Sequence, residues 1–158
     1  MTELEDLTEL RDALKSLQEE NAYDICIIDC QPTMQPLTLN VLVAADLVLI
    51  PIEAYAFSMN GMKIMMSYMD KMHQIRGQEL PYASVVVKYD KCMKNLEKIM
   101  KLIEQDGYVV CDTVISYSKA CCTSQDARKP LLGHRKNNVA TNDYIDLMEE
   151  LLREYIDA

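Results

Sequence analysis

The sequence predicts an α/β fold in three layers, with a mostly parallel sheet flanked by helices. Apolar runs typical of buried strands alternate along the chain with stretches of helical periodicity, and this alternation favours parallel strand pairing. The 158 residues are 49% hydrophobic and 26% charged, which is ordinary for a globular protein. No repeat or linker divides them, so we expect one domain over residues 1–158.

Helical periodicity predicts helices over 2–20, 37–45, 58–75, 92–106 and 139–156, with a short helix inside 117–138. The first begins at a capping-box pair, Thr2 and Glu5, and its leucines predict packing on a sheet or a short coiled-coil seam. The helix over 58–75 carries methionines at helical spacing. They form either core or an exposed partner surface, and core is the simpler interpretation.

Apolar runs predict strands at 24–29, 47–52 and 82–87, with two shorter pieces at 108–110 and 113–115. The first strand runs from Ile25 to Ile28 straight into Asp29. An aspartate at this position either handles magnesium beside a nucleotide or caps the following turn, and the residues alone leave both interpretations open.

The cysteines and the apolar runs exclude several classes of protein. Six cysteines occur without a CxxC pair, and the two histidines lie far apart, so the spacing of a zinc site is missing. No apolar stretch reaches the roughly 18 residues that a membrane span needs. The N-terminus is acidic, unlike a signal peptide. We therefore expect a cytoplasmic protein with reduced thiols and no membrane partner.

The net charge of −9 is unevenly distributed. Residues 1–30 carry −7, from nine acidic and two basic side chains, whereas residues 117–138 carry +4, from five basic side chains and one aspartate. A polyanion such as DNA would meet a favourable surface only in this second segment. Its basic residues are Lys119, Arg128, Lys129, Arg135 and Lys136.

Several motifs in order resemble the C-terminal part of the ParA/MinD-type (Soj-like) partitioning ATPases, the deviant Walker A class of P-loop proteins. They are YDICIIDCQPT, LTLNVLVAADLVLIPIEAYAFSMNGM, VVVKYDK, TVISYSKACCTSQDARKP and NNVATNDYIDLMEELL. The resemblance covers nearly all of residues 10–155. It implies a truncated P-loop NTPase fold, ATP and Mg²⁺ as the family's cofactors, and the Walker B role for Asp29, which would hold Mg²⁺ through water.

The family's KGGxGKT loop has no counterpart in this sequence. None of the four glycines lies in a GxxxxGK[ST] setting, so Asp29 would bind Mg²⁺ only if a P-loop were supplied. We expect no cofactor for the isolated chain and no ATP hydrolysis by it. Ser116 and Tyr117 stand where the family has a Pro-Arg pair beside the adenine, which weakens base recognition there and leaves Ser116 as a weak candidate for nucleotide contact. Asn137 and Asn138, before the final helix, remain candidates for contacting a base or ribose.

In the family's sheet the P-loop strand lies between the strands that match 24–29 and 47–52. Without it these strands either pair directly or expose open edges, so we expect a homo-oligomer or docking onto a ParA-type ATPase. Two functions follow from the resemblance. One is a ParA-like partitioning ATPase homologue or fragment that retains nonspecific DNA binding, and the alternative is a non-catalytic module that binds and modulates a full-length ParA-type ATPase.

Overall fold

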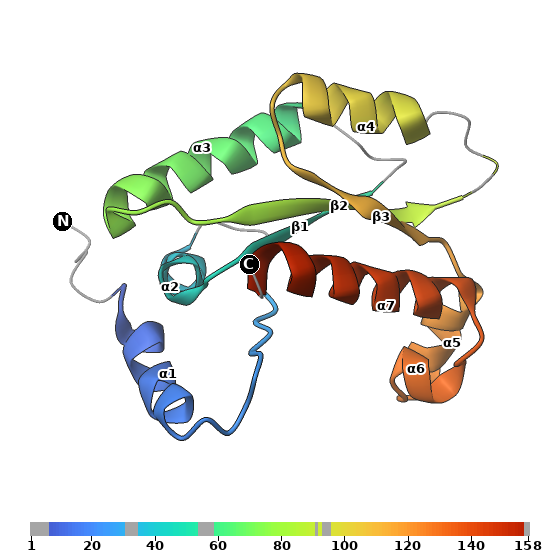
Figure 1. The fold of residues 1–158 in the computed structure, drawn as a ribbon, viewed down its shortest axis with the longest axis horizontal. Coiled ribbons are helices and arrows are strands. Elements are labelled where there is room, and N and C mark those ends of the chain that lie inside the picture. Colours follow the sequence, from blue (N-terminus) through green and yellow to red (C-terminus); the bar gives the residue numbers. More distant parts are fainter. Residues whose placement is uncertain (1–6, 31–34, 54–58, 91, 93–95, 157–158) are drawn as a thin grey trace. The chain divides into compact units, whose positions relative to one another are not determined.

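The computed structural model describes residues 7–30, 35–53, 59–90, 92 and 96–156, without the side chains of 59, 60 and 156. The chain forms two compact units. The first comprises Met1–Val48 and Lys63–Pro81, and the second comprises Leu49–Met62 and Tyr82–Ala158. Figure 1 shows the order of the helices and strands along the chain.

The first unit contains α1 (Glu9–Glu19), α2 (Pro36–Ala44) and most of α3 (Met59–Arg76). Helix α1 packs against α2, and the backbone N–H of Leu10 donates a 3.2 Å hydrogen bond to Oδ1 of Asn40. No residue of α1 is buried, so its leucine stripe is only partly covered. The capping-box pair predicted at Thr2 and Glu5 lies outside the described residues.

Arg76 ties the end of α3 to the end of α2. Its guanidinium Nη1 donates hydrogen bonds of 2.9 Å to the carbonyl oxygen of Leu42 and 2.5 Å to that of Ala45. These carbonyls belong to the last turn and the C-cap of α2, where the helix leaves backbone acceptors without partners. The core role of the methionine stripe is confirmed at Met69 and Met72, both of which are buried.

The strand predicted at 24–29 is wrong. Residues 22–30 form no helix or strand, and the side chain of Ile27 is 82% exposed. The sequence signal is that of a strand, but a strand is held by hydrogen bonds to a neighbouring strand and by burial of its side chains. Among the described residues, none supplies a neighbouring strand for this segment. We call residues 23–30 the apolar segment.

The second unit is built on a sheet in the order β1 (Val48–Glu53), β2 (Tyr82–Tyr89), β3 (Val110–Ser116), in which β2 and β3 pair in parallel. The parallel α/β prediction is thus confirmed, with the two short strands predicted near 108–115 joined as β3. Helices α4 (Leu96–Gln105) and α7 (Val139–Leu151) pack on the sheet from above and below β3 in Figure 1. Val85, Val86 and Ile103 form the centre of this core.

The predicted short helix in the basic segment is two helices, α5 (Lys119–Asp126) and α6 (Leu131–His134). They pack against each other, and Nε2 of His134 lies 3.2 Å from Oγ1 of Thr123. After them comes α7, which continues as a π-helical turn, η2 (Leu152–Ile156).

Two carboxylates of α7 bind backbone N–H groups of β3. Glu150 is buried and accepts hydrogen bonds from the N–H groups of Asp112 and Thr113, at 2.7 and 2.9 Å. Asp143 lies two turns earlier and accepts a 2.7 Å bond from the N–H of Ser116. Because β3 is the end strand of the sheet that the described residues form, these side chains satisfy donors that no strand in this part of the chain reaches.

Candidate functional site

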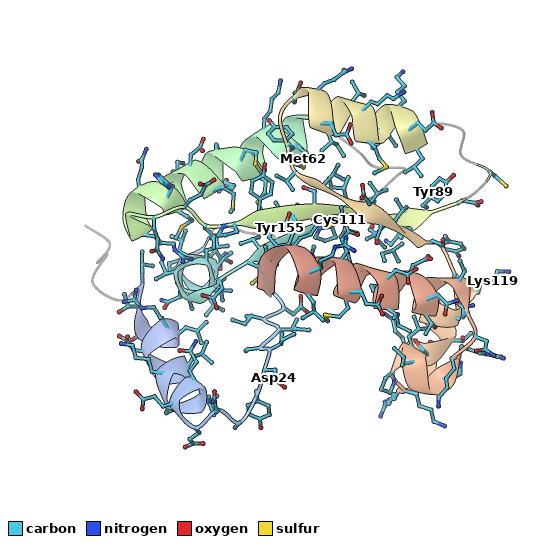
Figure 2. The ribbon with its side chains drawn as sticks, in the orientation of Figure 1. Asp24, Met62, Tyr89, Cys111, Lys119 and Tyr155 are labelled. Carbon is cyan, nitrogen blue, oxygen red and sulfur yellow. The ribbon has the colours of Figure 1, made fainter. Side chains whose placement is uncertain are left out.

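A pocket opens at the carboxyl ends of β2 and β3, where α/β proteins with parallel strands usually bind ligands. Its volume is about 270 Å³, and Tyr89, one of its lining residues, is labelled in Figure 2. Five residues line it: Tyr89, Asp90, Ser116, Tyr117 and Val139. Tyrosine, aspartate and serine are residue types that can stack on a flat ring and hydrogen-bond to its polar groups.

Backbone hydrogen bonds fix the walls of this pocket. The N–H of Tyr117 donates to the carbonyl of Tyr89 at 2.7 Å, which joins the two strand ends. On the β2 side, Oδ1 of Asp90 accepts a 2.9 Å bond from the N–H of Cys92 and closes the turn after the strand. The bond from Ser116 N–H to Asp143 holds the β3 side. The positions of these walls therefore depend on backbone contacts.

The predicted base-contacting residues gather at this end of the second unit with different roles. Ser116 lines the pocket. Asn138 is the N-cap of α7, and its Oδ1 accepts a 3.1 Å hydrogen bond from the N–H of Ala140, so this oxygen is already used in capping. Asn137 is exposed beside it and does not line the pocket.

Asp29 belongs to the first unit and is exposed at the end of the apolar segment. Mg²⁺ prefers several oxygen ligands in near-octahedral geometry, with one or two carboxylates completed by waters and phosphates. Among the described residues, no three His, Cys, Asp or Glu side chains gather into a metal site. The implied site needs only one carboxylate from this chain, with water and phosphates beside it, so the Walker B role of Asp29 stays a prediction.

The predicted DNA-binding residues are all exposed. They lie at the start of α5, in the turn between α5 and α6, and just after α6. Figure 2 labels Lys119 at the first of these places. Across the described part of the chain, none of them forms an ion pair with a carboxylate. The charges of Lys119, Arg128, Lys129, Arg135 and Lys136 are thus available to an anionic partner.

An ion pair joins two strands at the same end of the sheet. Nζ of Lys88, near the end of β2, donates a short hydrogen bond to Oε1 of Glu53, the last residue of β1. The hydrogen bond to Glu53 is the main cause of a raised pKa for Lys88, and the charge of Glu53 adds to it.

Sequence reasoning missed Tyr89, Asp90 and Tyr117 as one site, and it missed the pair of Glu53 with Lys88. Each residue follows or ends an apolar run, and side chains at the carboxyl ends of parallel strands converge at one edge of the sheet. This rule could have predicted from the sequence that these residues lie together. The structure adds the register that brings Tyr89 opposite Ser116.

Comparisons with known proteins place the chain in a family. The family model described as an AAA domain matches residues 1–81. The chromosome partitioning protein ParA of Caulobacter vibrioides is 27% identical over 145 residues, 90% of this chain and 54% of that protein. ParA of Myxococcus xanthus is 28% identical over 148 residues, 91% of this chain and 51% of that protein. The chain spans about half the length of such curated relatives.

Solved structures agree on the fold. A crystal structure of cobyrinic acid a,c-diamide synthase from Mycobacterium smegmatis with bound ADP and magnesium matches with a TM-score of 0.76. At 19% identity it covers 98% of this chain and 56% of that one. No helix among the described residues combines the length and apolar character of a membrane span. The chain shares the P-loop NTPase fold of the part of that structure that it covers, belongs to the AAA domain family and is a relative of the ParA-type partitioning ATPases.

Proposed function

We propose that this chain acts in ParA-type partitioning as a component that binds the DNA backbone and does not turn over ATP by itself. The observation that carries the proposal is the group of five exposed basic residues at the start of α5, in the turn between α5 and α6, and just after α6, which have no carboxylate partners among the described residues. Clustered cations attract DNA phosphates without reading base sequence, so the contact is nonspecific.

Two features support the absence of turnover by the chain alone. The sequence has no GxxxxGK[ST] loop, and Asp29 stands exposed outside any group of metal ligands among the described residues. Phosphoryl transfer depends on positioning and on stabilising charge around the phosphates, which one carboxylate does not supply. Steady, magnesium-dependent phosphate release by the pure chain would contradict this part of the proposal.

The pocket at the strand ends supports a subsidiary role for a nucleobase. Its volume of about 270 Å³ and its two tyrosines suit a stacked ring. Ser116 in its lining, and the exposed Asn137 two residues before the lining residue Val139, would contact a base or ribose. Without a phosphate-binding loop this contact contributes only weak affinity. ATP with Mg²⁺ would bind tightly only when a partner supplies that loop.

Binding of random duplex DNA at increasing salt concentration tests the main proposal. We expect affinity to fall linearly on a log–log plot, with a slope of about −0.9 for each phosphate that a Lys or Arg neutralises. A variant with Arg128, Lys129, Arg135 and Lys136 all changed to Gln should lose most of this dependence. A variant with Arg11, Lys15, Lys63 and Lys71 changed to Gln, all in the first unit, removes the same number of charges and controls for net charge.

The second candidate is a non-catalytic module that binds and modulates a full-length ParA-type ATPase. The observation that favours it is the exposed apolar segment, where Tyr23 is 73% and Ile27 is 82% exposed. Exposed apolar side chains on an unpaired backbone are suited to joining another protein, including a second copy of this chain. Co-purification with such an ATPase, and a changed ATPase rate on mixing, would support this candidate. Unchanged rates would argue against it.

A further inference from the structure

Lys88 and Arg128, both in the second unit, have backbone conformations that glycine adopts most readily. Among the described residues other than glycine, only Asn21, Lys88 and Arg128 have positive φ angles, of 49°, 55° and 51°. Asparagine adopts this left-handed region readily, whereas for Lys and Arg the region is sterically unfavourable. Glycine at either position would relieve strain, so the presence of two long basic side chains needs another explanation.

At Arg128 the conformation belongs to a helix end. The N–H of Arg128 donates to the carbonyl of Gln125 at 2.9 Å, and the N–H of Lys129 donates to that of Ser124 at 3.0 Å. This is the Schellman pattern, in which glycine is the usual residue at the left-handed position. The motif would form at least as well with glycine, so the backbone does not require arginine here.

At Lys88 the conformation belongs to an irregularity in β2. The register with β3 shifts between Val86 and Tyr89, so Lys88 lies in a bulge at the carboxyl end of the strand. Bulges redirect side chains and are frequent beside functional sites. The redirected ammonium group meets Glu53, yet both side chains are about half exposed, at 61% and 48%, and an exposed pair of this kind stabilises a fold very little.

Lys88 also lies near the start of the basic segment 117–138. It precedes Tyr89, whose carbonyl accepts the 2.7 Å hydrogen bond from the N–H of Tyr117, and α5 begins two residues after Tyr117, at Lys119. The end of β2 therefore adds a sixth cation, Lys88, beside the start of the segment that carries the other five. Unlike them it is held by a carboxylate, so a phosphate group would have to displace Glu53 to become its counter-ion.

We propose that Lys88 and Arg128 are retained as contacts to DNA phosphates at a cost in backbone strain, and that Glu53 competes with phosphate for Lys88. This inference rests on the proposed DNA binding. It adds Lys88, which lies outside the basic segment, as a contact to DNA, and Glu53 as a competitor of DNA for Lys88. Phosphate and carboxylate are alternative partners for one ammonium group, so Glu53 sets the threshold at which Lys88 joins the interface.

The test measures DNA affinity and thermal stability on the full chain, using fluorescence anisotropy with a random duplex of about 25 base pairs at about 50–200 mM salt. Lys88→Gly and Arg128→Gly should each weaken binding about 3- to 10-fold and reduce the salt slope by about 0.9. Both should leave the melting temperature unchanged or raise it by about 2 °C, because strain is relieved. Glu53→Gln should tighten binding about 2-fold.

Matched variants separate the causes. Asn21→Gly makes the same backbone change in the first unit, and Lys63→Gln removes an exposed charge there; both should leave binding within about 1.5-fold of wild type. Lys88→Asn, which tolerates the left-handed region, replaces Lys88→Gly if that variant does not fold. Wild-type protein that fails to bind DNA would overturn the proposed function and this inference together. Wild-type binding that Lys88→Gly and Arg128→Gly leave unchanged would overturn this inference alone.

Discussion

The apolar segment 23–30 and strand β2 are similar in sequence and different in structure. Both are runs of β-branched and aromatic residues that predict a buried strand. Strand β2 has a neighbour on each side, and Ala83 and Val86 are fully buried in it, whereas Ile27 is 82% exposed. The sequence pattern therefore indicates that a segment can form a strand, and the presence of neighbouring strands decides whether the strand forms.

The largest expected effect comes from placing a charge in each segment. Val86→Asp should destabilise the second unit by about 4 kcal/mol or more, because it buries a carboxylate without a partner. Ile27→Asp should change stability by no more than about 0.5 kcal/mol, because the side chain already lies in water. Urea unfolding followed by circular dichroism measures both. Equal losses would show that the apolar segment is packed as β2 is.

A smaller effect is expected at the outer edge of β3. Glu150→Ala should cost about 2–3 kcal/mol, because the N–H groups of Asp112 and Thr113 lose their acceptor in a buried setting. Glu149→Ala, next to it but exposed, should cost less than about 0.5 kcal/mol and serves as the control. If the two variants melt alike, the α7 carboxylates do not support the strand, and β3 would resemble the apolar segment more than β2.

The smallest effect concerns pH. Burial raises the pKa of the Cys111 thiol on β3 to about 12, from 9.0 in the absence of a protein environment. The folded state thus holds this proton more tightly than the unfolded chain, so the stabilisation is complete below pH 9 and is lost as the pH rises toward 12. By about pH 10 the loss should be roughly 1.4 kcal/mol. Cys111→Ala should remove this contribution from the measured free energy of unfolding.

Cys26 and Cys30 extend the same comparison, because they are exposed in the apolar segment while Cys111 is buried. In the native protein a thiol reagent should modify these two and leave Cys111 unmodified until the chain unfolds. Native protection of Cys26 and Cys30 would contradict the exposure of this segment.

Most of the fold could be predicted from the sequence because its signals are local. Helices α2, α3 and α7 begin within one or two residues of their predicted starts, and β1 and β2 do the same. The predicted strand at 24–29 failed because its outcome depends on a neighbouring strand. The positions of Lys119, Arg128 and the other basic residues on the surface were predictable from charge, since such side chains are seldom buried.

The candidate site was less predictable. The pocket needs Tyr89 and Tyr117 side by side, and their contact through the carbonyl of Tyr89 follows from the register of β2 with β3. A one-residue change of register would place other side chains there, and no local pattern fixes that register. The pair of Glu53 with Lys88 depends in the same way on the bulge in β2.

The carboxylates of Asp143 and Glu150 cover the edge of the sheet at β3. They already accept hydrogen bonds from the N–H groups of Asp112, Thr113 and Ser116, so these three donors are not available to an incoming strand. Growth by strand addition is then restricted to the margin at β1. Two molecules that joined there would terminate each other, giving a closed pair instead of a fibre.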